Sequence, residues 1–265
     1  MSYNFLIIGG DRRLSILAQK LLKDGNKVET YGNEVENIKE IENLEELEEN
    51  NSEIVISSIP LSKDGKNVYM PLSNKSITIE KLKKISNGKK LITGNEILND
   101  EVTTILNTIP TAEGAIQIAM EETTYTLSEC KVLVLGFGRV GKILCDRLKG
   151  IAKEVYCEAR KEKDLAWIKA YGYKPIPLEK LKENICKMDV VFNTIPYKIL
   201  DKHTLILMSN QTLIVDLASN PGGVDYDVAE KLGIKAILAS ALPGKVAPDT
   251  TSEFLKKFIY NEIEK

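Results

Sequence analysis

The residues most clearly spaced for chemistry are three glycines that follow an apolar run. In VLVLGFGRVG, residues 132–141, Gly136, Gly138 and Gly141 have the spacing G-x-G-x-x-G directly before an amphipathic stretch. Between a strand and a helix, this spacing lets backbone amides approach a diphosphate and lets the helix pack closely on the strand. The sequence therefore predicts a nicotinamide-dinucleotide site. Its predicted diphosphate contacts are Gly136, Phe137, Gly138, Arg139, Val140 and Gly141.

The end of the next apolar strand indicates which dinucleotide the site prefers. NAD sites carry Asp or Glu about 20 residues after the first glycine, where the carboxylate binds the ribose 2′-hydroxyl. Counting from Gly136 puts Ala159 at this position, and Arg160 and Lys161 follow, which suit a 2′-phosphate. Glu158 would stand at the ribose if the alignment shifted by one residue. The sequence favours NADP over NAD, with cofactor contacts at Ala159, Arg160 and Lys161.

Similar tetrapeptides mark further positions for ligand contacts. SSIP at 57–60 and NTIP at 193–196 each follow an apolar run, and proline cannot continue the hydrogen-bond ladder of a strand. In parallel sheets the carboxyl ends of the strands form the rim of the ligand crevice. The alternative is that both copies are simple strand-ending turns. The predicted contacts are Ser58 and Asn193 for the substrate, and Thr194, Ile195 and Pro196 for the cofactor.

A third copy, NTIP at 107–110, precedes a long helical pattern. Thr111 is expected to cap that helix, and Glu113 to lie in its first turn, where the helix dipole favours an acid. The amino terminus of this helix is expected to face a ligand. We therefore predict substrate contacts at Asn107 and Thr111, and Glu113 is a candidate for acid–base catalysis.

Loops near both ends of the chain carry further candidates. NPGG at 220–223 follows an apolar strand that ends at Asp216, and such a turn can present amides to an anion. Lys245 in LPGK is a candidate cation or proton donor, and Arg12 in GGDRR can bind a carboxylate. Each candidate also has a structural interpretation, as a turn residue or a surface charge. The predicted contacts are Ala218 for the cofactor, and Ser219, Asn220, Gly222, Gly223 and Arg12 for the substrate.

One order of elements occurs twice along the chain. Each half has an apolar run, a glycine turn, an amphipathic stretch and a second strand, beginning at NFLIIGG (4–10) and KVLVLG (131–136). This alternation predicts an α/β protein with two Rossmann-like doubly wound parallel-sheet domains joined by a connector helix. The first turn lacks the G-x-G-x-x-G spacing, so no second dinucleotide is expected there.

The predicted boundaries follow from the two copies. Residues 1–108 are expected to form a flavodoxin- or Rossmann-like substrate domain, which a C-terminal helix at 250–265 joins. Residues 109–126 are expected to form the connector helix, and residues 127–249 the NAD(P)-binding domain. The acidic segment 34–53 has apolar residues at helical spacing and is expected to form a solvated helix.

The composition argues against several classes of function. In 265 residues, 36 Lys and Arg balance 38 Asp and Glu, which gives no electrostatic case for a nucleic-acid or membrane partner. No apolar run is long enough to span a bilayer. Four cysteines without C-x-x-C spacing indicate reduced thiols and no metal site. We expect a cytoplasmic protein, and the sequence leaves a homo-oligomer open.

Several motifs together resemble the family of dipicolinate synthase A-subunits. They are GGDRR at 9–13, VLVLGFGRVGK at 132–142, DLASNPGG at 216–223 and LPGKVAP at 242–248. The resemblance covers nearly the whole chain. It implies a sporulation enzyme of the mother cell that oxidises dihydrodipicolinate, or its hydrated precursor, to dipicolinate with NADP. It also implies a small dicarboxylate substrate and a partner, the flavoprotein-like B-subunit of dipicolinate synthase.

Other functions stay open at this point. Glu158 stands where the resembled family usually has glycine, which affects the cofactor choice and not the fold. The same glycine turn also suits a nucleotide-sensing regulatory subunit without turnover, or an amino-acid or hydroxyacid dehydrogenase. A hydroxyacid dehydrogenase normally needs a cationic base–acid, and the single histidine, His203, lies away from the predicted rim.

Overall fold

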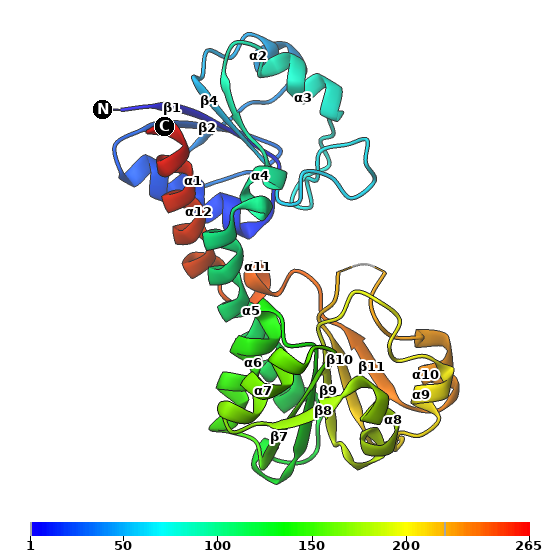
Figure 1. The fold of residues 1–265 in the computed structure, drawn as a ribbon. Helices are drawn as coiled ribbons and strands as arrows, with labels where there is room; N and C mark the ends of the chain where they lie inside the picture. The colour runs from blue at the N-terminus through cyan, green and yellow to red at the C-terminus, as the bar shows by residue number, and fades with distance from the viewer. Residues whose placement is uncertain (1, 220) are drawn as a thin grey trace. The chain divides into compact units, whose positions relative to one another are not determined.

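The computed structural model describes residues 2–219 and 221–265, and this part of the chain folds into two compact units (Figure 1). Unit 1 comprises the residues up to Asn107 together with Ala247–Lys265, and unit 2 comprises Thr108–Val246. Each unit has its own parallel sheet and its own apolar core.

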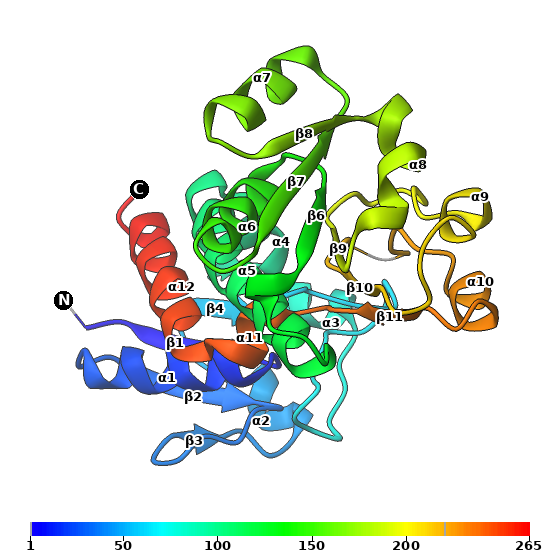
Figure 2. The ribbon, with the colours of Figure 1, turned by 90° about the horizontal axis from the view of Figure 1, so that it is seen from below.

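Unit 1 is built on the parallel strands β1 Asn4–Ile8, β2 Lys27–Tyr31, β3 Lys39–Glu40, β4 Ile54–Ser57 and β5 Lys90–Ile92. Their spatial order is β3-β2-β1-β4-β5, and Figure 2 labels the first four of these strands. Phe5 and Ile7 of β1 belong to one apolar cluster and Leu6 and Ile8 to another, because successive side chains point to opposite faces. Both faces are covered, which explains why the run is apolar throughout.

Helices cover both faces of this sheet. They are α1 Arg12–Lys23, α2 Leu44–Glu48, α3 Ile79–Ile85, α4 Gly94–Asn99 and α12 Pro248–Ile263. The C-terminal helix α12 packs against α1, and Leu255 and Ile259 share a cluster with Leu14 and Leu17. Leu82 of α3 belongs to the cluster on the opposite face.

The acidic segment 34–53 is helical only over α2, so the expectation of a longer solvated helix is wrong. Ile38 joins the apolar cluster on the α1 face of the sheet, whereas Ile41 and Leu47 join the cluster on the α3 face. Residues three apart on one helix share a face, so a single helix could not reach both clusters. The chain instead runs along the sheet edge as β3 and buries apolar side chains on both sides.

Unit 2 is built on the parallel strands β6 Lys131–Leu135, β7 Glu154–Ala159, β8 Lys174–Pro177, β9 Val190–Asn193, β10 Leu213–Asp216 and β11 Lys235–Leu238. Their spatial order is β11-β10-β9-β6-β7-β8, so the winding reverses between β6 and β9. Ligands of open α/β sheets bind outside the carboxyl ends of the strands at such a reversal. Leu135 and Asn193, which pair in register, mark this place.

The helices of unit 2 also lie on both faces of its sheet. They are α6 Arg139–Lys149, α7 Glu162–Ala170, α8 Leu181–Asn184, α9 Lys202–Leu205, α10 Tyr226–Lys231 and α11 Leu242–Val246. Leu144 of α6 packs in one cluster, and Leu205 of α9 and Ala229 of α10 pack in the other. The predicted fold class, α/β with two Rossmann-like doubly wound sheets, is confirmed.

Helix α5 differs from the predicted connector. It runs over Glu101–Glu122 and contains Pro110, so Thr111 does not cap it and Glu113 does not lie in its first turn. Asp100 stands at its start and accepts a hydrogen bond of 2.7 Å from the Thr103 amide. An interior proline costs a helix about 3 kcal/mol. Burial offsets this cost, since the alanines that follow the proline pack fully buried in the unit 2 core.

Candidate dinucleotide site

The glycine turn between β6 and α6 leaves room for a ligand at one position. Gly136 has a φ of +92°, and a Cβ on it would lie 2.7 Å from Thr194 Oγ1. A Cβ on Gly141 would lie 2.0 Å from the carbonyl oxygen of Gly136. A Cβ on Gly138 would meet no described atom within 4 Å, and no side chain forms a cap hydrogen bond at this N-cap position of α6. The fold itself requires two of the glycines, whereas the third faces open space.

The equivalent turn of unit 1 is closed by its own residues. The Asp11 carboxylate caps α1 and accepts a hydrogen bond of 3.1 Å from the Arg13 amide. The same carboxylate binds the buried Arg13 guanidinium at 2.8 Å. The Gly10 amide donates to the Tyr69 carbonyl at 3.0 Å. These donors are in use and do not face an outside anion.

A cavity of 640 Å³ lies beyond the carboxyl ends of β7, β8 and β9. Its apolar lining comes from Leu178 and Leu181 after β8, and from Ile195 and Ile199 after β9. The Ile195 side chain also lies 3.0 Å from the position of a Cβ on Gly136. The cavity therefore adjoins the glycine turn, and its apolar walls suit a flat ring.

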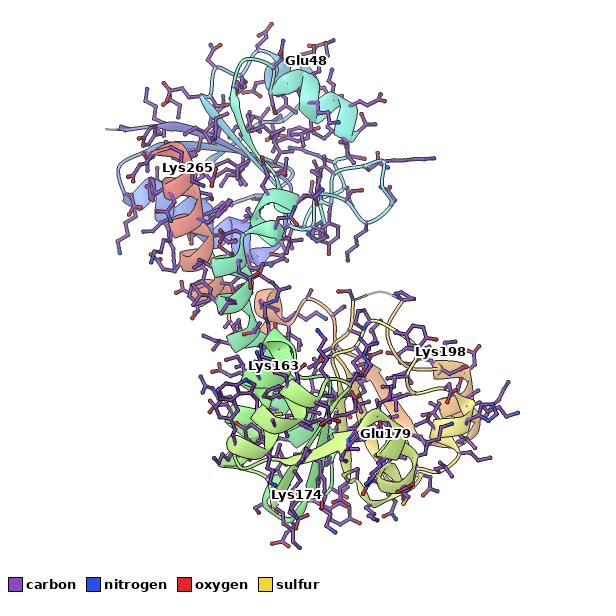
Figure 3. The ribbon with its side chains drawn as sticks, viewed as in Figure 1. Glu48, Lys163, Lys174, Glu179, Lys198 and Lys265 are labelled. Atoms are coloured by element: carbon purple, nitrogen blue, oxygen red, sulfur yellow. The ribbon has the colours of Figure 1, made fainter. Side chains whose placement is uncertain are left out.

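Charged side chains stand around this cavity. Arg160 is exposed on its rim and forms no hydrogen bond or ion pair within residues 2–219 and 221–265. Glu179 and Lys198, both labelled in Figure 3, also line it, and Lys198 pairs with Asp225 at 3.4 Å. The uncommitted guanidinium is a ready partner for an anionic group such as a phosphate.

The predicted cofactor contacts divide into two groups. Arg160, Ile195 and Pro196 line the cavity. Ala159 is buried in the core on the α6 side of the sheet, and Thr194 Oγ1 donates to the Leu135 carbonyl at 2.8 Å. The Ala159 side chain is therefore part of the core, and the Thr194 hydroxyl stabilises the turn rather than presenting a free group.

The loop after β10 is organised around a buried carboxylate. Asp216 accepts hydrogen bonds from the Ala218 amide at 3.1 Å and the Gly223 amide at 2.8 Å. It also accepts from Asn193 Nδ2 at 2.8 Å and the Tyr226 hydroxyl at 2.9 Å. Burial, and then the hydrogen bond to Asp216, raise the pKa of Tyr226. The anion held by this loop is thus the protein's own carboxylate.

This network changes the interpretation of several predicted substrate contacts. Asn193 is fully buried, and its side chain also donates to the Ile195 carbonyl and accepts from the Ile195 amide, each at 3.1 Å. A Cβ on Gly223 would lie 2.1 Å from Asn193 Nδ2, and one on Gly222 would lie 2.7 Å from Asp216 Oδ2. These residues hold the loop. Ser219 is exposed, and Asn220 lies outside the described residues.

The other predicted contacts lie apart from this network. Ser58 is buried, and its hydroxyl donates to the Leu61 carbonyl at 3.0 Å, so it positions a turn of unit 1. Arg12 is exposed in the first turn of α1, and Lys245 is exposed on α11. Asn107 and Thr111 are half-buried within α5, and Glu113 is exposed there.

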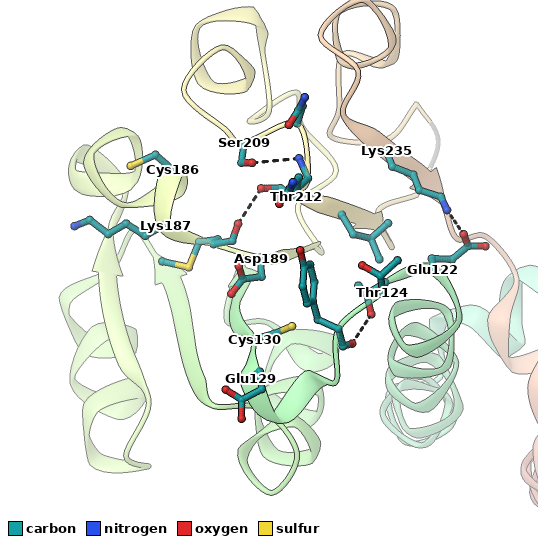
Figure 4. Close-up of a pocket in the computed structure, with 16 residues that line it drawn as sticks. Glu122, Thr124, Glu129, Cys130, Cys186, Lys187, Asp189, Ser209, Thr212 and Lys235 are labelled. Carbon is teal, nitrogen blue, oxygen red and sulfur yellow. Dashed lines mark hydrogen bonds and ion pairs between the residues drawn. The ribbon is translucent and has the colours of Figure 1, made fainter.

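A second pocket of unit 2 lies at the opposite, amino-terminal edge of the sheet (Figure 4). It has a volume of 580 Å³, and both polar and apolar groups line it; the lining residues include Cys130, Asp189, Gln211 and Lys235. Thr212 Oγ1 donates to the Met188 carbonyl there at 2.9 Å. Of the predicted site residues that the structure describes, none lines this pocket.

Sequence patterns did not reveal the residues that shape the cavity and the loop. Leu178 and Leu181 follow an edge strand, and nothing in their spacing distinguishes them from core residues. Tyr226 binds Asp216 from ten residues further along the chain. The one available signal was the polar end of β10, since an acid that ends an apolar strand must find partners nearby.

Both units match known protein families. Residues 4–110 match the family described as the N-terminal domain of the dipicolinate synthase A-subunit. Residues 109–241 match the family described as D-isomer specific 2-hydroxyacid dehydrogenase, NAD binding domain. The curated dipicolinate synthase A-subunit of Bacillus subtilis (strain 168) is 44% identical over 151 residues, which cover 57% of this chain and 51% of that protein. Residues 109–241, half of the chain, belong to the family of NAD-binding domains of D-isomer specific 2-hydroxyacid dehydrogenases, and the chain is similar to dipicolinate synthase A-subunits.

Solved structures of dipicolinate synthase A-subunits are similar over the full chain. The protein from Bacillus halodurans has a TM-score of 0.87 at 28% identity, covering 100% of this chain and 99% of that one. The A chain from Bacillus subtilis has a TM-score of 0.84 at 28% identity, covering 100% and 96%. A transhydrogenase from Sinorhizobium meliloti, 15% identical, shares the fold with a TM-score of 0.68, covering 98% and 95%.

Two predictions are confirmed by these similarities. The resemblance to the family of dipicolinate synthase A-subunits is one, and the presence of an NAD(P)-binding domain in unit 2 is the other. The curated match spans about half of that relative's length. Among the described residues, no helix combines the length and the apolar character that crossing a bilayer would require.

Proposed function

We propose that this chain oxidises dihydrodipicolinate, or its hydrated precursor, to dipicolinate, with NADP as the hydride acceptor. The observation that carries the proposal is the glycine turn at Gly138, which faces open space beside a cavity with the uncommitted guanidinium of Arg160. The substrate class comes from the dipicolinate synthase A-subunits to which the chain is similar.

The residues of unit 2 fit a dinucleotide at three points. The amino terminus of α6 at Gly138 suits a diphosphate, because its amides and the helix dipole favour an anion. The apolar walls at Leu178 and Leu181 suit an adenine ring. Arg160 suits a 2′-phosphate, while Ala159 leaves no acid at the usual position for a ribose hydroxyl. The guanidinium of Arg160 and the absence of an acid at Ala159 both support NADP over NAD.

From dihydrodipicolinate the reaction removes a hydride and a proton, and from the hydrated precursor it removes a water molecule as well, so that the ring becomes aromatic. When bound, the oxidised dinucleotide accepts the hydride at its nicotinamide ring. The proton leaves to water, and aromatisation drives the step, so little acid–base help is required. The protein's task is to hold the substrate ring in a reactive orientation and to keep its two carboxylates bound.

The substrate carboxylates need cations, amides or hydroxyls. We propose Arg12, Lys245 and Ser219 as contacts, since these side chains are exposed in their own units. Ser58 and Asn193 are less suitable, because their side chains are buried in hydrogen bonds within the protein. Asn107, Thr111 and Glu113 stay candidates from positions inside α5.

The cellular context is part of the proposal. The family resemblance supports a role in sporulation, in the cytoplasm of the mother cell, together with the flavoprotein-like B-subunit. A pull-down from sporulating cells with this chain as bait tests the partner. Recovery of other proteins without the B-subunit would contradict it.

A coupled assay tests the reaction. Dihydrodipicolinate is supplied with NADP or NAD, with and without the B-subunit, while absorbance at 340 nm and dipicolinate are followed. We expect both signals to rise together with NADP. If no combination reduced the nicotinamide while dinucleotide binding persisted, the chain would be a nucleotide-sensing regulatory subunit instead.

A further inference from the structure

An apolar groove of 400 Å³ lies on the surface of unit 2, between helices α5 and α6 (Figure 1). Its apolar side chains are Ile116 and Met120 of α5 and Ile151, which follows α6. All of its lining residues belong to the part of the chain from Thr108 to Val246. The groove shares no lining residue with the cavity beside the glycine turn, so the proposed reaction does not account for it.

Met120 shows that this groove is open to water. Ile116 and Met120 are four residues apart and share one face of α5. Ile116 packs in the core of unit 2, whereas Met120 is 53% exposed. Ile151 is half-buried at the edge of the same core. An apolar strip that the chain leaves exposed along a concave surface is typical of a face that binds another protein.

Charges of both signs border the apolar strip, and they come from different helices. Glu113 and Glu121 lie on α5, and Arg147 lies on α6. Arg147 binds the neighbouring Asp146 at 2.8 Å. Glu121 accepts a hydrogen bond of 2.8 Å from Gln117. These contacts are exposed and local and contribute little to stability, so they can be exchanged for contacts with another chain.

We propose that the α5–α6 groove is the contact surface between two copies of this chain. A twofold axis places the same patch of both copies face to face, so the patch must complement itself. This groove meets that condition, because its apolar strip can cover the strip of the other copy and its base and acids can meet opposite charges there. Methionine and arginine, here Met120 and Arg147, are also enriched in protein interfaces. A groove with charges of a single sign would instead favour a partner of the opposite sign.

Sedimentation equilibrium of the full chain at several concentrations tests the proposal. We expect wild type to form a dimer. Met120→Glu should raise the dissociation constant of this dimer at least about thirtyfold, because it places a charge in the apolar strip at the centre of the contact. The far-UV circular dichroism spectrum of this variant should match that of wild type, because Met120 is exposed in the single copy.

Charge reversals test whether the other side of the contact is a second copy. Arg147→Glu places like charges opposite each other and should weaken the dimer about tenfold or more. Adding Glu113→Lys or Glu121→Lys to this variant restores opposite charges. One of the two double variants should then recover the wild-type dissociation constant within about threefold. With an unrelated partner, a second change in this chain could not correct the first.

Ile206→Glu is the matched control, because it introduces the same acid at an exposed apolar residue elsewhere on unit 2. Ile206 directly follows α9 and is 62% exposed. Leu205 of α9 packs in the apolar cluster on the face of the sheet opposite α6. We expect the dissociation constant of this variant to stay within about twofold of wild type, as is usual for surface substitutions outside a contact.

Three results would overturn the inference. A wild-type chain that stays monomeric up to about 100 μM would not form a specific dimer. A dimer that Met120→Glu leaves intact would be held together by another surface. If Arg147→Glu did not weaken the dimer, or if neither double variant restored it, the charge pairing that favours a second copy would be absent. None of these measurements involves a dinucleotide, so their outcome is independent of the proposed function.

Discussion

Gly138 offers a direct test of whether the glycine turn serves a ligand or the fold. Its φ of −79° and ψ of −162° are open to any residue, and a Cβ there would meet no described atom within 4 Å. Replacing an N-cap glycine by a residue without a capping group costs a helix less than about 1 kcal/mol. We therefore expect Gly138→Val to change the free energy of unfolding by less than about 1 kcal/mol.

The matched substitution is Gly141→Ala in the same turn. Its Cβ would lie 2.0 Å from the carbonyl oxygen and 3.0 Å from the carbonyl carbon of Gly136. The obstacle is backbone, which cannot turn away as a flexible side chain can, and overpacking of this kind costs about 1–3 kcal/mol or more. Urea unfolding should place the two variants well apart, with Gly141→Ala the less stable.

For cofactor binding we expect the opposite order, with Gly138→Val the more strongly affected variant. A valine side chain at position 138 would occupy the space in which a diphosphate approaches the α6 amides. Loss of one or two hydrogen bonds to a charged group, about 1.5–3 kcal/mol each, weakens binding by a factor of about 10 to more than 1,000. NADPH fluorescence titration measures this directly.

Either of two outcomes would contradict this description of the glycine turn. If Gly138→Val bound NADPH as tightly as wild type, the turn would not hold the diphosphate. If Gly138→Val unfolded as readily as Gly141→Ala, the description of the turn as open would be wrong.

Three further predictions follow from buried groups and thiols. Tyr226→Phe removes a hydrogen bond of 2.9 Å to buried Asp216 and should lower the free energy of unfolding in urea by about 1.5–3 kcal/mol. An unchanged urea midpoint would show that this hydrogen bond does not stabilise the loop. Asp11→Ala removes the cap of α1 and leaves buried Arg13 unpaired, so we expect thermal unfolding to show a free energy of unfolding lower by about 2–5 kcal/mol. An unchanged free energy of unfolding would mean that the ion pair is solvated. Ellman's reagent should label Cys186 alone rapidly in the folded protein, since the other three cysteines are buried; a second fast thiol would contradict this.

Local patterns predicted the elements that depend on neighbouring residues. The glycine spacing at 136–141 predicted a turn between strand and helix, because the steric demands of such a turn act within a few residues. Apolar runs such as 132–135 predicted buried parallel strands, because both of their faces are covered. The family resemblance rested on the same motifs.

Local patterns failed where distant contacts decided the outcome. Pro110 indicated a helix start, yet α5 continues through it, because its buried alanines pack on the unit 2 core. Ser58 directly follows β4 and Asn193 ends β9, but the Ser58 hydroxyl binds the Leu61 carbonyl and the Asn193 amide binds Asp216, so both side chains hold loops. No spacing in the chain reveals which carbonyl or carboxylate a strand-ending side chain will meet.

The amino-acid sequence by itself determined the alternation of strands and helices, the glycine turn and the family, because each depends on periodicity and steric limits over short stretches. Only the tertiary structure decided which polar groups stay free for a ligand. In the folded protein the carboxylates of Asp11 and Asp216 have ion-pair or hydrogen-bond partners within the chain. Arg160 has no such partner among the described residues, and Glu158 is buried beneath the cavity. Those outcomes depend on groups brought together from separate strands, where burial makes every unmet hydrogen bond costly.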